Sequence, residues 1–486
     1  MKNLVVVNSV EDWRIGQADF ELVSAKDYLT HQIYKDGKRF RVYNLCRNYS
    51  YCSFGYYVSL LAQARGHRPL PSVSTILDMK HAGMIRHGSD ELEDLIQKSL
   101  QAIRSKEFKL SIYFGKNLSP KYDRLSRSIY SLFRTPFIRV FFEKQKGGYW
   151  RIRNISPIPS SEIPKGHHDF VLEVMQDFFN RRRDQEVKKK TYKYDLAILV
   201  NPNEKLPPSD AEAIKKFIKA ADRLKIWAEV IEPSEAARLM TFDALFIRET
   251  TNVDHHTYRM ARRGEAEGLV VIDDPLSILR CCNKVFLYEI LKYNQIATPK
   301  TQVFSSSNYL EEMKGLSYPL VLKDPDSAFS LGVKKVHSSE EFRAQAEEFF
   351  KDTDLLIGQE FVPTDFDWRV GVINHQPLYV CKYFMARSHW QIINSQGEKG
   401  IEEGRAHTFL PNEVPRQLVE TALKAASLIG DGLYGVDLKE INGQYSVIEV
   451  NDNPSIDEGY EDKLLKSELY DRIMSVFYDR LESRMK

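Results

Sequence analysis

The hydrophobic pattern of residues 1–180 alternates short apolar runs with stretches of helical periodicity. The short runs are bounded by polar or turn residues, whereas the helical stretches repeat apolar positions every three or four residues. The pattern predicts strands over 3–8, 20–24 and 40–45 and helices over 54–66, 89–105 and 170–183. We therefore expect a mixed α/β domain in the N-terminal part of the chain.

The same alternation returns in a more regular form in residues 194–275. It predicts strands over 196–200, 227–231, 244–247 and 268–272, with helices over 209–224 and 234–239. Strands that alternate with helices indicate a parallel sheet, and open sheets of this kind bind ligands beyond the carboxyl ends of their strands. Arg248 and Thr251 follow one such end. We therefore predict that these two residues hold a substrate carboxylate.

A basic segment, residues 181–193, separates these two regions. It holds seven basic groups against two acidic ones, which is compatible with a contact to RNA or to an acidic protein. A solvated helix end followed by a linker explains the same composition and is the interpretation that we favour. We place a domain boundary in this segment.

Composition excludes several classes of function. The 486 residues carry 69 basic and 67 acidic side chains, and this balance argues against nucleic acid as the main partner. No segment approaches 18 uninterrupted apolar residues, so we expect no membrane span. The oligomeric state is left open, with a homo-oligomer as one alternative.

Histidine and cysteine side chains show no metal-binding pattern along the chain. The pair His255–His256 has no third ligand at a suitable spacing, and the five cysteines lack C-x-x-C spacing. We therefore expect reduced thiols that pack inside a cytoplasmic protein.

Basic and small polar residues between 277 and 336 are suited to binding phosphate. A helix is predicted to begin just before Lys284, and an apolar strand ends at Lys323. The loop after that strand carries Ser330 and Gly332, and small residues let backbone N–H groups approach an oxyanion. Lys323, at the end of its strand, would contact a phosphate as a point charge. Taken alone, the segment is a weak signal, and an ordinary polar hairpin loop is the alternative.

A second apolar strand, near residues 354–362, ends in Gln359 and Glu360 and is followed by Asp367 and Arg369 on another strand. Exposed backbone at the end of such a strand can bind an adenine edge, and a nearby carboxylate can accept ribose hydroxyls. The segment is therefore a candidate for the base and sugar of a nucleotide.

Acidic and amide side chains converge in a predicted hairpin over residues 435–454. The Asn442–Gly443 turn joins two arms, with Asp437 on the first and Glu449 and Asn451 on the second. A two-residue turn would place Glu449 on the face opposite Asp437, whereas a three-residue loop or a single bulge would place them directly across from each other. Oxygen ligands of this kind suit Mg²⁺. A solvated hairpin with ordinary surface acids is the alternative.

Four pieces follow one another along the chain: the helix near Lys284, the strand that ends at Lys323 with its loop, the strand near 354–362, and the hairpin over 435–454. In this order they resemble the ATP-grasp superfamily, and in particular its RimK-like and glutathione-synthase-like carboxylate–amine ligases. The resemblance spans roughly residues 277–480, and an accessory domain of RimK-like proteins resembles the N-terminal part. It implies an α/β chain with an accessory domain (1–180), a basic linker (181–193), a pre-ATP-grasp domain with a small parallel sheet (194–275) and an ATP-grasp domain of two α+β subdomains (276–486).

The resemblance also implies roles for individual residues. ATP would contact Lys284, Lys323, Ser330, Gln359, Glu360, Phe361, Val362 and Asp367. Two Mg²⁺ ions, with Mn²⁺ as an alternative, would be held by Asp437, Glu449 and Asn451. Arg369 would face the substrate.

The chain departs from the family where an arginine usually lies near the transferred phosphate. Lys382, Arg387 and Arg405 are the candidates to replace it. The glycine-rich segment 393–409 resembles a lid that would carry Arg405 onto the reacting groups, and a surface loop without that role is the alternative.

The function implied by the resemblance is an ATP- and Mg²⁺-dependent ligase that acts through an acyl phosphate. Its substrates would be an amino acid or peptide carboxylate and an amine acceptor, as in the addition of an amino acid such as glutamate to a peptide or small molecule. Two alternatives stay open: a nucleotide-binding regulatory module without turnover, and a kinase that stops at phosphoryl transfer.

Overall fold

The computed structural model describes residues 2–16, 20–35, 40–81, 83, 85, 89, 92–145, 147–180, 192–326, 332–386, 390–397 and 400–484. The chain divides into two compact units, Met1–Lys189 and Lys190–Lys486. Of the predicted linker, residues 181–191 lie outside the described part. Among the described residues, no helix combines the length and the apolar character needed to cross a membrane.

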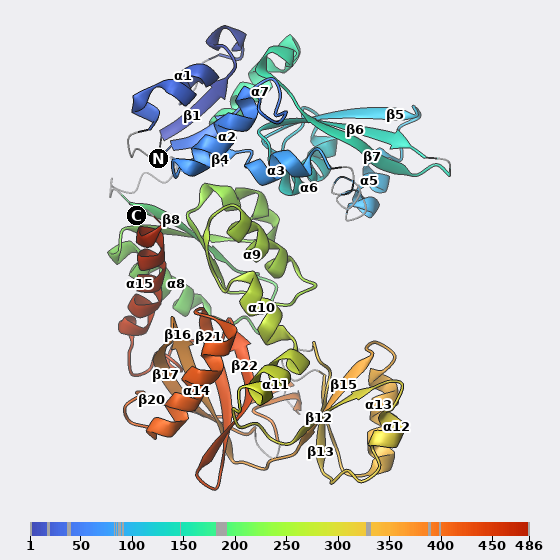
Figure 1. Cartoon of the computed structure of the whole chain (residues 1–486), viewed down its shortest axis with the longest axis vertical. Coiled ribbons are helices and arrows are strands. Elements are labelled where there is room, and N and C mark those ends of the chain that lie inside the picture. The colour runs from blue at the N-terminus through green and yellow to red at the C-terminus, as the bar shows by residue number, and fades with distance from the viewer. Residues whose placement is uncertain are drawn as a thin grey trace. The chain divides into compact units, whose positions relative to one another are not determined.

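The first unit contains two small sheets (Figure 1). One is parallel, with strand order β2-β1-β3-β4, and the other is antiparallel, with order β5-β6-β7. The strands are β1 (Lys2–Val7), β2 (Glu21–Ser24), β3 (Phe40–Asn44), β4 (Arg68–Leu70), β5 (Glu107–Tyr113), β6 (Phe137–Lys144) and β7 (Trp150–Pro157). The main helices are α1 (Ala25–Thr30), α2 (Phe54–Ala64), α3 (Val73–Asp78), α5 (Glu93–Leu100), α6 (Asp123–Leu132) and α7 (His168–Asn180). The mixed α/β character predicted for this region is confirmed.

The second unit begins with a parallel sheet of order β11-β10-β8-β9. Both faces of this sheet are buried, because alternate residues of its central strand β8 belong to two different apolar cores. Leu196 and Ile198 pack with helices α8 and α15, whereas Ala197 and Leu199 pack with α9. The elements are β8 (Tyr194–Leu199), β9 (Ile226–Ile231), β10 (Ala244–Ile247), β11 (Val270–Ile272), α8 (Ala211–Arg223), α9 (His256–Ala266) and α15 (Ser467–Ser483).

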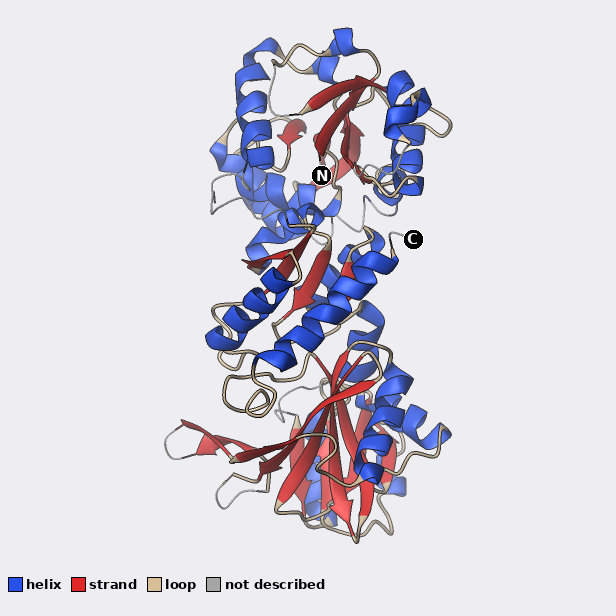
Figure 2. Cartoon of the chain, turned by 90° about the vertical axis from the view of Figure 1, so that its left-hand side faces the viewer, coloured by secondary structure: helices blue, strands red, loops and turns tan. Residues whose placement is uncertain are grey.

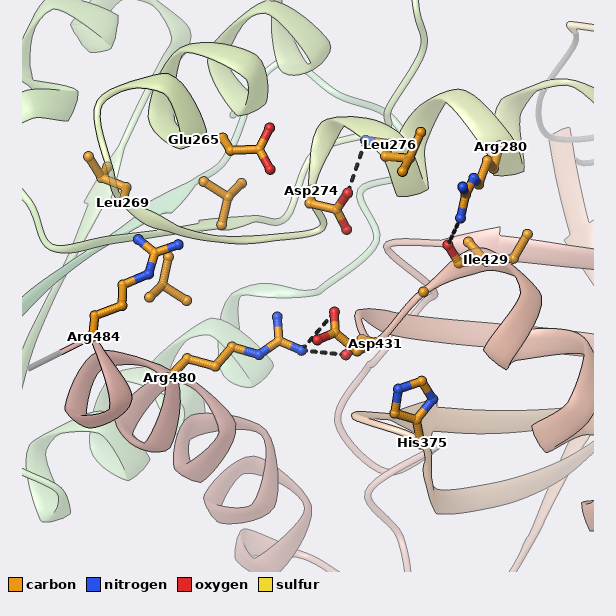
Figure 3. Close-up of a pocket in the computed structure, with 13 residues that line it drawn as sticks. Glu265, Leu269, Asp274, Leu276, Arg280, His375, Ile429, Asp431, Arg480 and Arg484 are labelled. Atoms are coloured by element: carbon orange, nitrogen blue, oxygen red, sulfur yellow. Dashed lines mark hydrogen bonds and ion pairs between the residues drawn. The ribbon is translucent and has the colours of Figure 1, made fainter. Parts of the chain in front are cut away.

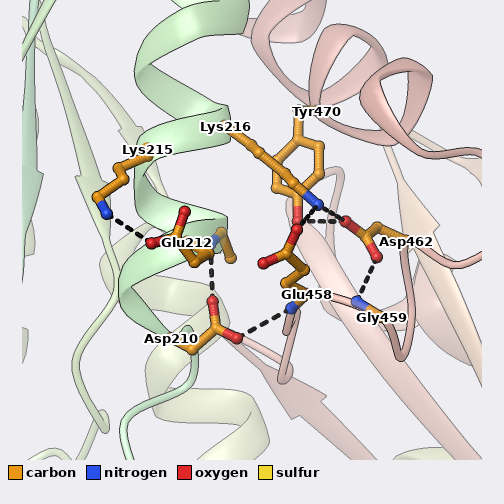
Figure 4. Close-up of polar contacts among 9 residues, drawn as sticks. Asp210, Glu212, Lys215, Lys216, Glu458, Gly459, Asp462 and Tyr470 are labelled. Carbon is orange, nitrogen blue, oxygen red and sulfur yellow. Dashed lines mark hydrogen bonds and ion pairs between the residues drawn. The ribbon is translucent and has the colours of Figure 1, made fainter.

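A network of polar contacts joins α8 to the segment before α15 (Figure 4). Lys216 Nζ lies 2.5 Å from Asp462 Oδ2 and 2.9 Å from Glu458 Oε1. The Tyr470 hydroxyl donates to the same Asp462 oxygen at 3.0 Å. Asp210 accepts from Ala213 N and Glu458 N and thereby caps α8. Charge-assisted bonds therefore fix the start of α8 to the segment that leads into α15.

An antiparallel sheet of order β12-β15-β13-β14 follows in the chain. Its apolar face packs against α13, with Phe304 and Phe342 in edge-to-face contact at 5.1 Å between ring centroids. The elements are β12 (Thr301–Ser305), α12 (Tyr309–Glu312), β13 (Leu320–Lys323), β14 (Val333–Val336), α13 (Ser339–Phe349) and β15 (Leu355–Glu360).

A five-stranded antiparallel sheet of order β20-β17-β16-β21-β22 completes the second unit. Helices lie against this sheet, with α14 packed on its apolar face (Figures 1 and 2). The elements are α10 (Pro275–Cys282), α11 (Lys284–Tyr293), β16 (Phe366–Ile373), β17 (Gln376–Phe384), β20 (Ala406–Phe409), α14 (Arg416–Ile429), β21 (Leu433–Ile441) and β22 (Gln444–Asp452). A separate two-stranded sheet consists of β18 (Ile393–Gly397) and β19 (Gly400–Glu403). The predicted fold class, with a parallel sheet followed by two α+β subdomains, is confirmed.

Candidate active site

The β21–β22 hairpin places two carboxylates directly opposite each other. Its two-residue turn has Asn442 at φ 52° and Gly443 at φ 75°, as the left-handed turn types require. A bulge next to Asp437 then shifts the register by one residue, so that Asp437 pairs with Glu449. The bulge is therefore the device, among those considered from the sequence, that brings both acids to one face.

Asp437 is held by a bidentate ion pair with Arg369 of the neighbouring strand β16. Arg369 Nε donates to Asp437 Oδ1 at 2.6 Å, and Nη2 donates to Oδ2 at 2.7 Å. The Asn451 side-chain amide donates to the same Oδ2 at 3.1 Å. Burial raises the pKa of the Asp437 carboxyl, and the Arg369 charge opposes this increase. The three predicted oxygen ligands and Arg369 therefore share one half-buried face of the sheet.

A further lysine, Lys439, lies on this face. Its ammonium is 2.5 Å from Asp367 Oδ1 and donates to the Thr364 hydroxyl at 2.6 Å. The sequence prediction did not include Lys439. The signal was present, because a residue two positions after Asp437 on a strand points to the same side.

Two predicted phosphate lysines approach this face from other elements. Lys284 is the first residue of α11, and its Nζ lies 3.8 Å from Glu449 Oε1. Lys323 ends β13, and its Nζ donates to Gln359 Oε1 at 2.8 Å. Burial lowers the pKa of Lys323 to about 8, and the positive charges of Lys284 and Lys439 act in the same direction. The structure thus concentrates positive charge where a phosphate chain would need it.

The predicted adenine segment continues from β15. Gln359 is buried between Lys323 and the Thr301 hydroxyl, to which its amide donates at 2.9 Å. Glu360 is exposed, whereas Phe361 and Val362 are half-buried. Lys335 Nζ lies 3.6 Å from the centre of the Phe361 ring. Ser330, predicted to contact phosphate, lies outside the described residues.

The structure contradicts the prediction that Lys382 replaces the family arginine. Lys382 pairs with Trp368, and residues directly across an antiparallel ladder share a face. Its ammonium lies 4.1 Å from the centre of the Phe366 ring and 4.5 Å from that of Trp368. Arg369, the next residue after Trp368, points to the opposite face, so Lys382 faces away from Asp437.

The contacts in the structure do not show whether Arg387 or Arg405 takes the arginine role. Arg387 lies outside the described residues. Arg405 is exposed between β19 and β20, and its carbonyl accepts from Phe384 N at 2.9 Å. The side chains of residues 393–403, the first part of the predicted lid, also lie outside the described part.

The structure also contradicts the substrate role predicted for Arg248 and Thr251. The Arg248 side chain is fully buried, and its guanidinium donates to Ser209 Oγ, to Asn453 Oδ1 at 2.6 Å and to backbone carbonyls. The Thr251 hydroxyl donates to Asp452 Oδ2 at 2.7 Å. Both side chains hold the loop after β10 against the end of β22, so the protein itself takes up the donors that a substrate would need.

A separate cavity of about 480 Å³ lies elsewhere in the second unit (Figure 3). None of the predicted site residues lines it. Its arginines bind the protein, since Arg280 donates to Ile429 O at 2.6 Å and Arg480 pairs with Asp431 at 3.1 Å. The cavity therefore shares no lining residue with the predicted site at Asp437. The cavity is lined by Glu265, Leu269, Val270, Val271, Asp274, Leu276, Arg280, His375, Ile429, Gly430, Asp431, Arg480 and Arg484.

The donor atoms at the Asp437 face fit a magnesium nucleotide. Asp437, Glu449 and Asn451 offer carboxylate and amide oxygens, which are the ligands that Mg²⁺ prefers. Lys284 and Lys323 lie at the same face and suit phosphate oxygens as point charges.

Comparison with known families gives two matches in different parts of the chain. A model of the RimK-like ATP-grasp N-terminal domain matches residues 25–174. A model of the D-Ala–D-Ala ligase C-terminus matches residues 288–459, which include most of the site described above.

Similarity to individual proteins concentrates on ligases. The α-aminoadipate–LysW ligase LysX of Saccharolobus solfataricus is 31% identical over 200 residues, which are 39% of this chain and 68% of that protein. The coenzyme γ-F420-2:α-L-glutamate ligase of Methanococcus maripaludis is 26% identical over 41% of this chain and 68% of that protein. Among solved structures, a RimK-domain ATP-grasp protein of Sphaerobacter thermophilus aligns with 58% of this chain and 98% of its own, at 16% identity and a TM-score of 0.45.

Proposed function

The chain belongs to the RimK-like ATP-grasp ligases, enzymes that form carbon–nitrogen bonds, and on this premise we propose that it activates a carboxylate as an acyl phosphate for attack by an amine. The observation that carries the proposal is the convergence of three lysines and an arginine on the face that holds Asp437 and Glu449. This face carries four positive groups and three carboxylates. The positive groups are Lys284, Lys323, Lys439 and Arg369, and the carboxylates are Asp367, Asp437 and Glu449. The surplus is suited to a polyphosphate.

Each residue of this face has a task in phosphoryl transfer, which depends on position and charge more than on covalent catalysis. Lys284 and Lys323 bind and orient the phosphate oxygens. Asp437, Glu449 and Asn451 would hold Mg²⁺, which supplies charge neutralisation at the transferred phosphate. The backbone and side chains from Gln359 to Val362 bind adenine, and Asp367 accepts the ribose hydroxyls after it parts from Lys439.

The substrate side of the proposal rests on Arg369 and on the relatives. Arg369 lies between Asp437 and the ring of Tyr383, with its guanidinium 5.2 Å from the ring centre. When the acid turns to a metal ion, one edge of this guanidinium becomes available for an acyl phosphate or a carboxylate. The named relatives join α-aminoadipate or glutamate to their acceptors. We therefore propose an amino acid as one substrate and a peptide or small molecule as the other.

Domain roles follow the same division as in the sequence. We propose that residues 276–486 carry catalysis, that residues 194–275 form the pre-ATP-grasp domain, and that residues 1–180 form the accessory domain. The segment 181–193 would link that domain to the rest.

An ADP-release screen tests the proposed function. The full chain, ATP and Mg²⁺ are combined with amino acids, dipeptides and peptide carboxylates in pairs, and products are identified by mass spectrometry. A product that is heavier by one amino acid less one water supports the ligase. A stable phosphorylated product would instead support a kinase, and binding of ATP without any turnover would support a regulatory module.

One substitution tests the assignment of the metal ligands. Glu449→Gln keeps the shape of the side chain and removes a charge, so we expect turnover to fall by about 10²-fold or more, as when one strong electrostatic stabiliser is lost. Glu440→Gln is the matched control, because Glu440 lies on the same hairpin and bonds to Trp368 on the other face. Equal turnover in the two variants would contradict the assignment.

A further inference from the structure

Two histidines and a buried glutamate meet where the loop after β10 enters α9. Glu249, His255 and His256 each offer one ligand atom, and these atoms all lie within 4.8 Å of one another. The sequence prediction found no third ligand for the histidine pair, because it did not consider a carboxylate six residues upstream. In the structure Glu249 Oε2 lies 2.7 Å from His256 Nε2.

We propose that Glu249, His255 and His256 form a site for a divalent transition metal of the zinc class. Two imidazoles and one carboxylate are a ligand set that binds zinc and leaves a fourth position open for water or a substrate atom. The set differs from the oxygen-only ligands at Asp437, which favour Mg²⁺. The two sites would therefore select different ions.

The geometry of the buried carboxylate supports this site. The Glu249 side chain is 2% exposed, and its Oε2 lies 2.7 Å from His256 Nε2. Its other oxygen accepts from the Asn201 amide at 2.9 Å. One oxygen is thus fixed by an outer partner while the other faces an imidazole, which is the arrangement that orients a carboxylate toward a metal.

A hydroxyl contact and a ring contact position the two histidines. His255 Nδ1 lies 3.0 Å from the hydroxyl of the buried Thr257, which leaves Nε2 as its second ring nitrogen. The His255 and His256 rings are in contact, tilted by 44° to each other with 3.8 Å between their centroids, so they lie side by side. His256 is 29% exposed, so an ion from solvent can reach the site.

The position of the site gives it a consequence for the rest of the unit. The Glu249 carbonyl accepts from Asn453 Nδ2 at 2.6 Å, two residues after Asn451 on the chain. The loop lies beyond the carboxyl end of β10, where open parallel sheets bind their ligands. A bound metal would order this loop and present its open position at that edge of the sheet.

The test is binding of Zn²⁺ and Co²⁺ to the full chain without nucleotide. We expect calorimetry to show one tight Zn²⁺ per chain, and Co²⁺ to give a spectrum without the intense sulfur-to-metal band of a cysteine site. Glu249→Gln, His255→Ala and His256→Ala should each abolish the tight site. Asn201→Ala, which removes only an outer partner, should weaken it about 10–100-fold.

Three controls separate this site from others. His375→Ala removes a histidine elsewhere in the same unit, Cys52→Ser removes an exposed thiol, and Asp437→Asn alters the Mg²⁺ ligands. All three should keep the wild-type affinity for Zn²⁺, and the circular dichroism of every variant should match the wild type. The proposal is overturned if the wild type binds no tight Zn²⁺, if the Glu249 and histidine variants bind as tightly, or if Asp437→Asn abolishes binding.

Discussion

The low pKa of Lys323 predicts that the affinity for ATP depends on pH. Because burial and two neighbouring lysines lower this pKa to about 8, about 90% of Lys323 is charged at pH 7 and about 10% at pH 9. Only the charged form attracts phosphate oxygens, and a bound polyphosphate would raise the pKa again. Binding should therefore take up a proton and should weaken as pH rises through 8.

The magnitude follows from the charged fraction. Affinity should fall about tenfold between pH 7 and pH 9, or about 1.4 kcal/mol in binding free energy. At pH 8, binding should take up about half a proton per site. The last pKa of a phosphate group is about 6, so the ligand contributes little to proton uptake at pH 8 and above.

Titration calorimetry with a non-hydrolysable ATP analogue measures both quantities. Affinities are compared at pH 7, 8 and 9, and proton uptake is obtained from two buffers with different ionisation enthalpies. Lys323→Met should bind weakly at every pH and lose the slope, whereas Lys334→Met, which removes an exposed lysine of β14, should keep it. A flat profile in the wild type, or a slope that persists in Lys323→Met, would refute the reasoning.

Two further predictions concern the two faces of the five-stranded sheet. Lys382→Met should change ADP release by less than about twofold, because substitutions away from a site usually have small effects. The Lys382 ammonium lies among aromatic rings on the side away from Asp437. A tenfold loss of ADP release would instead support the arginine-like role. Gly371→Ala should lower the free energy of unfolding by about 1–3 kcal/mol in urea denaturation, because the new Cβ would lie 2.3 Å from the buried Tyr379 ring. An unchanged urea midpoint would contradict that packing argument.

Local patterns explain why most elements were predictable. Strand and helix positions depend on neighbouring residues, and the hairpin around Asn442–Gly443 follows from turn chemistry that is specific to those two residues. The acids at 437 and 449 could be placed on one face only conditionally, since the bulge that joins them has no strong sequence signal. The structure contains the bulge and pairs Asp437 with Glu449.

The errors arose where distant segments meet. The Arg248 guanidinium donates to Asn453 and Pro454, about two hundred positions away in the chain. No local sequence pattern shows that these contacts occupy its donors. Lys382 was a different case, because its face follows from pairing with Trp368, and the partner strand has to be known first. Lys439 was missed although strand alternation alone would have found it.

The bulge beside Asp437 changes the sequence spacing at which the two acidic metal ligands face each other. In a regular hairpin with a two-residue turn, residues that face each other are separated by an odd number of positions, yet Asp437 and Glu449 are twelve apart. A deletion of one residue on β22 between the turn and Glu449 would leave the turn and the ladder able to form. It would also move Glu449 into the place of Ile448, the residue that pairs with Asp437 in a ladder without a bulge. A chain one residue shorter could therefore keep both acids face to face with no bulge, whereas loss of the bulge alone would turn Glu449 to the other face.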